Sequence, residues 1–337
     1  MCPGTRARDL VPVIRADTVI NGVTVASNGR VFVSIQPQDG SPVEVAEVIG
    51  GALRPYPDRR WNGWHAGSDA ATAFVGVNAL RIGPDGALWV VDKGSRALGM
   101  APLPGGTKVV RIDLANGRVL RSYDLAAIAG PGSFIDDIRF NGRHAYLTDV
   151  ARGALVILDL ESGAARRVLT GHKALTGKPL ISADGPLHFP DGKAVIANAD
   201  QLEVSPDGRW LYVQPASGGM SRIATRYLDD SGLSDEALGE HLEPFADTPP
   251  TGGTTIDAQG NIYLGDLAGS RILKVDPAGN IRTVITDKRL IWPDAMWIDA
   301  RNRLWVPAAQ LNRTRDLNGG VDAVRYPVRV YTVSLKK

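Results

Sequence analysis

A short motif recurs six times along the chain: an alternating apolar strand, a turn containing Asn, Asp or Gly, and a second apolar strand. The copies are VTVASNGRVFVS (23–34), LRIGPDGALWVVD (80–92), IRFNGRHAYLTD (138–149), DQLEVSPDGRWLYV (200–213), TTIDAQGNIYLGD (254–266) and MWIDARNRLWVP (296–307). Such alternation around a turn is typical of a β-hairpin. Successive turns are separated by about 40 to 65 residues, which is the spacing of propeller blades.

A second hairpin follows several copies, at 108–125, 154–170 and 270–286. Two hairpins make a four-stranded antiparallel sheet, so the sequence predicts an all-β, six-bladed β-propeller within a single domain spanning 1–337. The last copy is followed by only one further strand, at 326–335, and we expect residues 10–20 to close the ring by pairing with it. Residues 1–9 are expected to be loose. A β-sandwich is the alternative, but it would not need six similar copies.

Composition narrows the function classes. The net charge is +2 and the 38 basic and 36 acidic residues are interspersed, so we expect no nucleic-acid partner. The sequence has no run of 18 apolar residues, so we expect no membrane span. With Cys2 as the one cysteine, internal disulfides are excluded.

No signal peptide is recognisable, which favours the cytoplasm as the location of the protein unless a leader has been removed. No P-loop or dinucleotide motif occurs, and we expect no nucleotide, flavin or haem cofactor. We also expect the protein to be a monomer.

Aligning the six copies on their turns brings one position into register. It lies eight residues before the turn residue, or six where the third copy has a shorter turn, and it carries Asn21, Asn78, Asp136, Asp200, Gly252 and Asp294. Equivalent positions in a propeller lie at one level around the axis. We call these six positions the axial ring, and we expect their side chains to meet at the mouth of the innermost strands.

Three crowded carboxylates raise one another's pKa unless something compensates their charge. A hard divalent cation does so, and calcium prefers carboxylate and amide oxygens. The ring therefore predicts a Ca²⁺ site formed by Asn21, Asn78, Asp136, Asp200 and Asp294, while the lack of histidine argues against zinc or iron. The alternative is that each Asn or Asp simply caps backbone amides at a strand entry.

Several segments resemble the yellow and major royal jelly protein family: LRPYPDRRWNGW (53–64), GALWVVDKGS (86–95), SPDGRWLYVQPASG (205–218) and LIWPDAMWIDARNRLWV (290–306). The resemblance covers most of the chain and implies a six-bladed propeller of the superfamily that includes gluconolactonases and senescence marker proteins. In that superfamily an axial cation activates water or polarises a lactone carbonyl. The resemblance implies Asn78, Asp136, Asp200 and Asp294 as its ligands. The glutamate usual in the first blade is absent, and Asn21 stands near its level.

These observations predict a small-molecule enzyme, a cation-dependent hydrolase of a lactone or related cyclic ester. Asp136, Asp200 or His188 would act on the proton of the attacking water. Aromatic residues in connections near the inner strands, Trp61, Trp64, Phe134 and Trp292, are expected to contact the substrate. Lys93 is expected to be a surface charge. The yellow resemblance implies two alternatives: a metal-free isomerase or tautomerase of dopachrome type, and a non-catalytic binder of small aromatic ligands.

Overall fold

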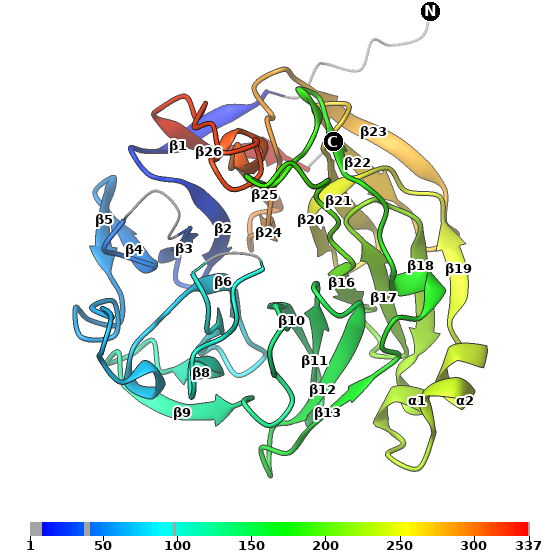
Figure 1. The fold of residues 1–337 in the computed structure, drawn as a ribbon. Helices are drawn as coiled ribbons and strands as arrows, with labels where there is room; N and C mark the ends of the chain where they lie inside the picture. Colours follow the sequence, from blue (N-terminus) through cyan, green and yellow to red (C-terminus); the bar gives the residue numbers. More distant parts are fainter. Residues whose placement is uncertain (1–8, 37–40, 97–98, 336–337) are drawn as a thin grey trace, which may run out of the picture.

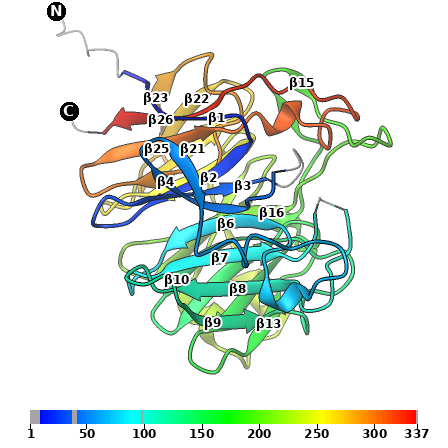
Figure 2. The ribbon, with the colours of Figure 1, turned by 90° about the vertical axis from the view of Figure 1, so that its left-hand side faces the viewer.

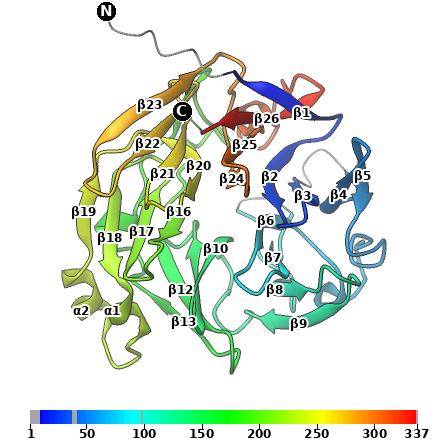
Figure 3. The same cartoon turned by 180° about the vertical axis from the view of Figure 1, so that it is seen from behind.

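The structure of the protein is a computed structural model that describes residues 9–36, 41–96 and 99–335. The segment 1–9, expected to be loose, lies outside these residues except for its last position, and so does Cys2. Six four-stranded antiparallel sheets surround a central axis (Figures 1 and 3). In five sheets the first strand along the chain lies nearest the axis, and in the sixth, which contains both ends of the chain, the first strand lies at the rim. The prediction of a six-bladed propeller is confirmed.

The strands follow the predicted hairpins blade by blade. Blade 1 contains β2 (Ile20–Val25), β3 (Val31–Ile35), β4 (Val45–Ile49) and β5 (Ala52–Pro55). Blade 2 contains β6 (Val77–Ile82), β7 (Leu88–Lys93), β8 (Thr107–Ile112) and β9 (Val119–Asp124). Blade 3 contains β10 (Ile135–Asn141), β11 (His144–Asp149), β12 (Ala154–Asp159) and β13 (Ala165–Val168).

The second half of the ring repeats this pattern. Blade 4 contains β16 (Ala199–Val204), β17 (Trp210–Pro215), β18 (Met220–Ala224) and β19 (Glu243–Ala246), with the short helices α1 (Thr225–Asp229) and α2 (Asp235–Glu240) before its last strand. Blade 5 contains β20 (Thr251–Ile256), β21 (Ile262–Asp266), β22 (Arg271–Val275) and β23 (Ile281–Thr286).

Blade 6 closes the ring with strands from both ends of the chain. It contains β24 (Trp297–Ile298), β25 (Arg303–Ala308) and β26 (Val328–Ser334), and its outer strand is β1 (Val11–Ala16). β1 pairs antiparallel with β26, from Val11 opposite Thr332 to Ala16 opposite Val328. The predicted closure is confirmed, and it covers an edge of β26 that would otherwise expose unpaired backbone groups.

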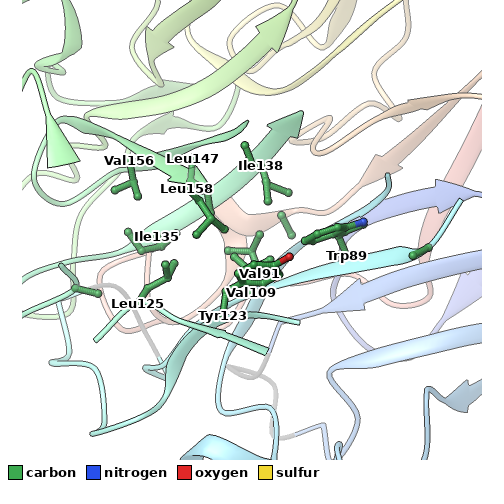
Figure 4. Packing of buried hydrophobic residues seen from close by; sticks show 14 residues of the cluster. Trp89, Val91, Val109, Tyr123, Leu125, Ile135, Ile138, Leu147, Val156 and Leu158 are labelled. Carbon is green, nitrogen blue, oxygen red and sulfur yellow. The ribbon is translucent and has the colours of Figure 1, made fainter. Parts of the chain in front are cut away.

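The hydrophobic core consists of layers between neighbouring blades. Figure 4 shows one layer, in which Trp89, Val91 and Tyr123 of blade 2 face Ile138 and Leu147 of blade 3. All five side chains are buried. Because each layer is filled by the apolar faces of two sheets, every blade is held in place by both of its neighbours, and the inner strands are fixed in position around the axis.

Two long connections lie on the same side of the ring (Figure 2). The first, residues 169–198, joins blades 3 and 4 and contains the small hairpin β14 (Ile181–Ser182) and β15 (Gly185–Pro186). The second, residues 309–327, joins β25 to β26. We refer to these two connections as the roof, because residues of both line the axial cavity described below. In the described part of the chain, no helix has the length and apolar character needed to cross a bilayer.

Candidate functional site

The inner strands are irregular where the axial ring begins. In five blades the register between the first and second strand shifts, between Ile20 and Gly22, Val77 and Ala79, Ile135 and Ile138, Ala199 and Gln201, and Thr251 and Thr254. Each shift spans the ring position of its blade. A β-bulge turns a side chain out of the regular alternation of a strand. The same irregularity, repeated around the axis, therefore turns these side chains toward a common space.

The structure brings all six ring positions together. They line one axial cavity with a volume of about 120 Å³: Asn21, Asn78, Asp136, Asp200, Gly252 and Asp294. Two of the four predicted aromatic contacts, Phe134 and Trp292, line the same cavity. Asn21 and Asp294 are buried, whereas Asn78, Asp136 and Asp200 are half-buried and face the cavity.

Two carboxyl groups of the ring form a pair. Asp136 and Asp200 share a hydrogen bond, with the Asp136 carboxyl as donor and the Asp200 carboxylate as acceptor. Burial and the charge of Asp200 raise the pKa of Asp136 well above its usual value. Burial and the charge of Asp294 raise the pKa of Asp200 to about 7, although the hydrogen bond from Asp136 opposes this shift. The pair therefore holds a proton that it can exchange near neutral pH.

Asp294 stands apart from this pair but faces the same cavity. Burial, followed by the charge of Asp136, raises its pKa well above the usual value. Hydrogen bonds from the backbone N–H of Ala295, at 2.8 Å, and from the side chain of Trp292 oppose this shift. Three carboxyl groups from three blades thus share a space in which their charges are not balanced.

Amide side chains position the carboxyl groups. The Nδ2 of Asn78 donates to Oδ1 of Asp136 at 2.5 Å, and the Nε2 of Gln201 donates to Oδ2 of Asp200 at 2.6 Å. Gln36 donates to Oδ1 of Asn78 at 3.2 Å. Neither glutamine was predicted as a site residue. Gln201 directly follows a ring residue, and Gln36 follows a second strand, where other blades carry apolar residues or Lys93.

The ring contains donors that a divalent cation prefers, but these donors do not enclose a single point. Among residues 9–36, 41–96 and 99–335, no three His, Cys, Asp or Glu side chains are grouped as ligands of one ion. Both ends of the Asn21 amide are engaged: Oδ1 accepts from Ser34 at 2.9 Å, and Nδ2 donates to the Asn78 carbonyl at 2.7 Å. Carboxyl oxygens with uncompensated charge still fit a hard cation in chemical type, and such a cation competes with the proton shared by the Asp pair.

Three predicted site residues lie elsewhere. Trp61 packs within the core between blades 1 and 2, 5.1 Å from the ring of Phe74. Trp64 lines separate surface depressions and lies near Arg96. His188 is exposed, and its backbone pairs with the second roof connection. None of these three residues is among the described residues that line the axial cavity. Trp61 and Trp64 lie away from it, and His188 belongs to the roof without lining the cavity, so the geometry does not support their predicted contact with an axial substrate.

Lys93 is buried, so the expectation of a surface charge is wrong. Its side chain is only 1% exposed, and its Nζ donates to the carbonyl of Gly76 at 3.2 Å and lies 5.4 Å from the centre of the Phe134 ring. Burial lowers its pKa, which the nearby carboxyl groups of Glu44 and Asp92 oppose.

A second tier of charged residues fills the axis beyond the ring. Arg81 and Arg139 both form ion pairs with Asp137, and Arg139 also binds Glu203 at 2.6 Å. Burial would raise the pKa of Asp137, but the two arginines outweigh it and hold this pKa well below the usual value. Thr254 of blade 5 donates to Glu203 at 2.8 Å, and Arg81 reaches the carbonyl of Met296. The network joins four inner strands and closes the axis on this side.

The chain is similar to two groups of known proteins. A model of the major royal jelly protein family matches residues 75–337. Protein yellow of Drosophila subobscura is 27% identical over 309 residues, covering 82% of this chain and 53% of the relative. A gluconolactonase of Zymomonas mobilis is 27% identical over 207 residues, covering 60% of this chain and 52% of the relative. The chain thus spans about half the length of the curated relatives it matches.

A solved structure shares the fold over the whole chain. The gluconolactonase of Xanthomonas campestris superposes with a TM-score of 0.57 at 15% identity, and the match covers 98% of this chain and 90% of that one. The fold predicted from the six repeats, the match of the family model and the sequence relatives agree with one another. The chain belongs to the major royal jelly protein family, within the six-bladed propeller superfamily that includes the gluconolactonases.

Proposed function

We propose that the axial cavity is the active site of an enzyme that hydrolyses a small lactone or related cyclic ester. One observation carries this proposal: a hydrogen-bonded carboxyl pair, Asp136 and Asp200, and a third carboxyl, Asp294, face one cavity. The similarity to a gluconolactonase over 60% of the chain supports the same class of reaction. Hydrolysis of an ester needs a group that takes a proton from water and a group that returns one to the leaving oxygen.

The Asp pair can supply both groups. Asp200, with a pKa of about 7, takes a proton from water while the water oxygen attacks the ester carbonyl. Asp136 gives its proton to the ring oxygen as the carbon–oxygen bond breaks, and the product is a hydroxy acid. Transfer of the proton from Asp200 to Asp136 across their hydrogen bond then restores the starting state. Asn78 and Gln201 hold the two carboxyl groups in place through their side-chain N–H groups.

A divalent cation such as calcium would be held by the carboxyl groups of Asp136, Asp200 and Asp294, and by Asn78 if its amide oxygen exchanges the hydrogen bond from Gln36 for the ion. When bound, the cation would polarise the carbonyl and stabilise the developing oxyanion. Asn21 contributes through Asn78, to whose backbone it is bonded, rather than as a direct ligand.

The test measures hydrolysis and cation binding separately. A panel of lactones is assayed with a pH indicator before and after chelator treatment, and calcium binding to the treated protein is followed by calorimetry. We expect Asp136→Asn to reduce hydrolysis by about 100-fold or more and Asp294→Asn to weaken calcium binding. Asp207→Asn is the matched control, because Asp207 lies exposed in the turn of the hairpin that carries Asp200.

Absence of lactone hydrolysis across the panel would contradict the proposal. Hydrolysis that survives chelation would keep the acid–base role of the Asp pair and discard the cation.

A second candidate is a metal-free isomerase or tautomerase acting on an oxidised catechol-type ring. It is favoured by the position of Phe134 and Trp292, which line the same cavity as the proton-sharing pair and offer faces on which a planar ring can stack. Turnover of a dopachrome-type substrate in the presence of chelator, without lactone hydrolysis, would select this candidate. Tight binding of such rings without turnover of either substrate class would instead indicate a ligand-binding protein.

A further inference from the structure

The axial cavity has two chemically different sides. One side carries the amide and carboxyl groups of the ring. The other side is formed by Phe134, Val150, Ala197, Trp292, Leu311 and Leu317, which all line the cavity and belong to one hydrophobic cluster. A ligand that fills the cavity therefore contacts polar groups at one end and an apolar wall at the other.

The apolar side follows from the repeat. In each blade, one residue ends or directly follows the second strand. Its backbone N–H donates to a backbone carbonyl in the segment just before the ring position. In blades 3 to 6 this residue is Val150, Ala216, Leu267 and Ala309, all members of the same apolar cluster. In blades 1 and 2 it is Gln36 and Lys93. This position is thus apolar in blades 3 to 6 and polar in blades 1 and 2, and two of its residues, Gln36 and Val150, line the cavity directly.

The roof completes the apolar wall and is held in place. Arg313 forms an ion pair with Asp184 at 2.7 Å, and Asn312 donates to the same carboxylate at 2.8 Å. The backbone of His188 accepts from Gly319 at 2.8 Å and donates to Leu317 at 3.3 Å. These contacts join the two roof connections to each other, so Leu311 and Leu317 stand over the cavity in fixed positions.

The ionisable groups of the cavity all carry the same sign. Of its described lining residues, those that ionise are Asp136, Asp137, Asp200, Asp294 and Asp316, with no Lys, Arg or His. The two arginines behind Asp137 are already paired with carboxylates. Without a bound cation, a phosphate or carboxylate on a ligand would therefore meet like charges, because the buried amine of Lys93 does not line the cavity and donates to the carbonyl of Gly76.

We propose, building on the hydrolase function above, that the substrates are neutral lactones with an apolar ring or chain beside the ester, rather than sugar lactones or anionic lactones. The ester would face the Asp pair, and the apolar part would pack against Trp292, Leu311 and Leu317. Hydroxyl groups of a sugar lactone packed against these three side chains would lose their water hydrogen bonds, and among the described roof residues that line the cavity only Thr314 and Asp316 offer polar side chains to replace them. An apolar substituent gains free energy at the same place.

The experiment compares three lactones of similar ring size: 3,4-dihydrocoumarin, δ-valerolactone and δ-gluconolactone. We expect kcat/KM to fall in that order. Leu317→Gln makes the wall polar and is expected to lower kcat/KM for dihydrocoumarin by about tenfold, with less than about a twofold change for gluconolactone. Ile181→Gln is the matched control, because Ile181 belongs to the roof but is 51% exposed and does not line the cavity; it should change neither.

A binding measurement separates this inference from the hydrolase proposal. The lactam analogue of dihydrocoumarin resists hydrolysis, and its binding is followed by tryptophan fluorescence in wild type and Leu317→Gln. If the lactam binds wild type, binds Leu317→Gln more weakly, and no lactone is hydrolysed, the result would contradict the hydrolase function and support the proposed class of ligand. Preference for gluconolactone, an equal effect of Leu317→Gln on all three lactones, or no binding of the lactam would overturn the ligand class.

Discussion

Asp200 shows how a single carboxyl group is placed at a cost to the fold. It lies in the bulge that begins β16, accepts hydrogen bonds from Gln201 and Asp136, and faces the cavity. Its ordinary pKa of 3.8 is raised to about 7 by burial and by the charge of Asp294. A group whose pKa is higher in the folded than in the unfolded chain destabilises the fold once the pH exceeds its unfolded value.

The pH dependence of stability follows from this shift. Between pH 4 and pH 7 the folded protein keeps a proton that the unfolded chain has lost, so the free energy of unfolding falls as the pH rises. This loss is complete above pH 7 and absent below pH 4. We expect Asp200→Asn to be more stable than wild type at pH 8 by on the order of 2–4 kcal/mol, and nearly equal at pH 4. Urea denaturation at a series of pH values measures the difference.

Asp207→Asn is again the control. The pKa of Asp207 is lowered to about 2 by hydrogen bonds from Ser205 and Arg209, so its contribution is lost only as the pH falls toward 2. The slope between pH 4 and 7 should persist in this variant. In Asp200→Asn the slope should become smaller without vanishing, because the pKa values of Asp136 and Asp294 are raised as well. A slope as large as that of wild type would mean that Asp200 does not carry the raised pKa.

The inner strands show what the sequence could and could not predict about the site. The offset from each turn identified every ring position, because the repeat keeps the strand length constant. Asp137 was not identified, since regular alternation places neighbours on opposite faces, and only the bulge brings it to the cavity beside Asp136. The roof could not be predicted because residues 169–198 and 309–327 lie outside the repeat and meet through contacts such as Asp184 with Arg313.

The break in the ring at blade 5 has a steric cause. A Cβ atom at Gly252 would lie 2.5 Å from the carbonyl oxygen of Pro293 and 2.9 Å from the side chain of Leu267. No side chain fits there unless the entry to blade 6 moves, so this blade cannot complete the ring of Asn and Asp.

We expect Gly252→Ala to lower the free energy of unfolding by about 2–3 kcal/mol, because the extra methyl group overpacks the contact between blades 5 and 6. Gly130→Ala is the matched control. A Cβ atom at Gly130 would have no heavy atom within 4 Å, and we expect a change of less than about 0.5 kcal/mol. Chemical denaturation measures both variants, and equal stability of the two would contradict the steric explanation.

The whole molecule depends on the closure of the ring. The six repeats predicted the number of blades, and the unequal ends of the chain predicted that β1 would complete blade 6. Both were predictable because blade spacing and strand count follow from local patterns. Ile14 of β1 is buried and packs in one cluster with Trp305 and Val330, whereas the neighbouring Val13 is 39% exposed.

Ile14→Ser tests the contribution of the closing strand. It removes buried apolar area and places a hydroxyl group in the core, which should lower the free energy of unfolding by about 2–4 kcal/mol. Val13→Ser, one position away on the exposed face, should cost less than about 1 kcal/mol. Thermal unfolding followed by circular dichroism compares the two. Equal losses would mean that the β1–β26 contact does not stabilise the ring.

The paired charges of Arg81, Asp137, Arg139 and Glu203 make the cavity a dead end. A channel open at both faces would let a product depart on one side while the next substrate arrived on the other. Here these side chains fill the axis on the far side of the ring, so the substrate enters and the product leaves on the side of the roof. Under the proposed chemistry a hydroxy acid that lingers keeps the next lactone out, and its own negative charge among the aspartates hastens its exit.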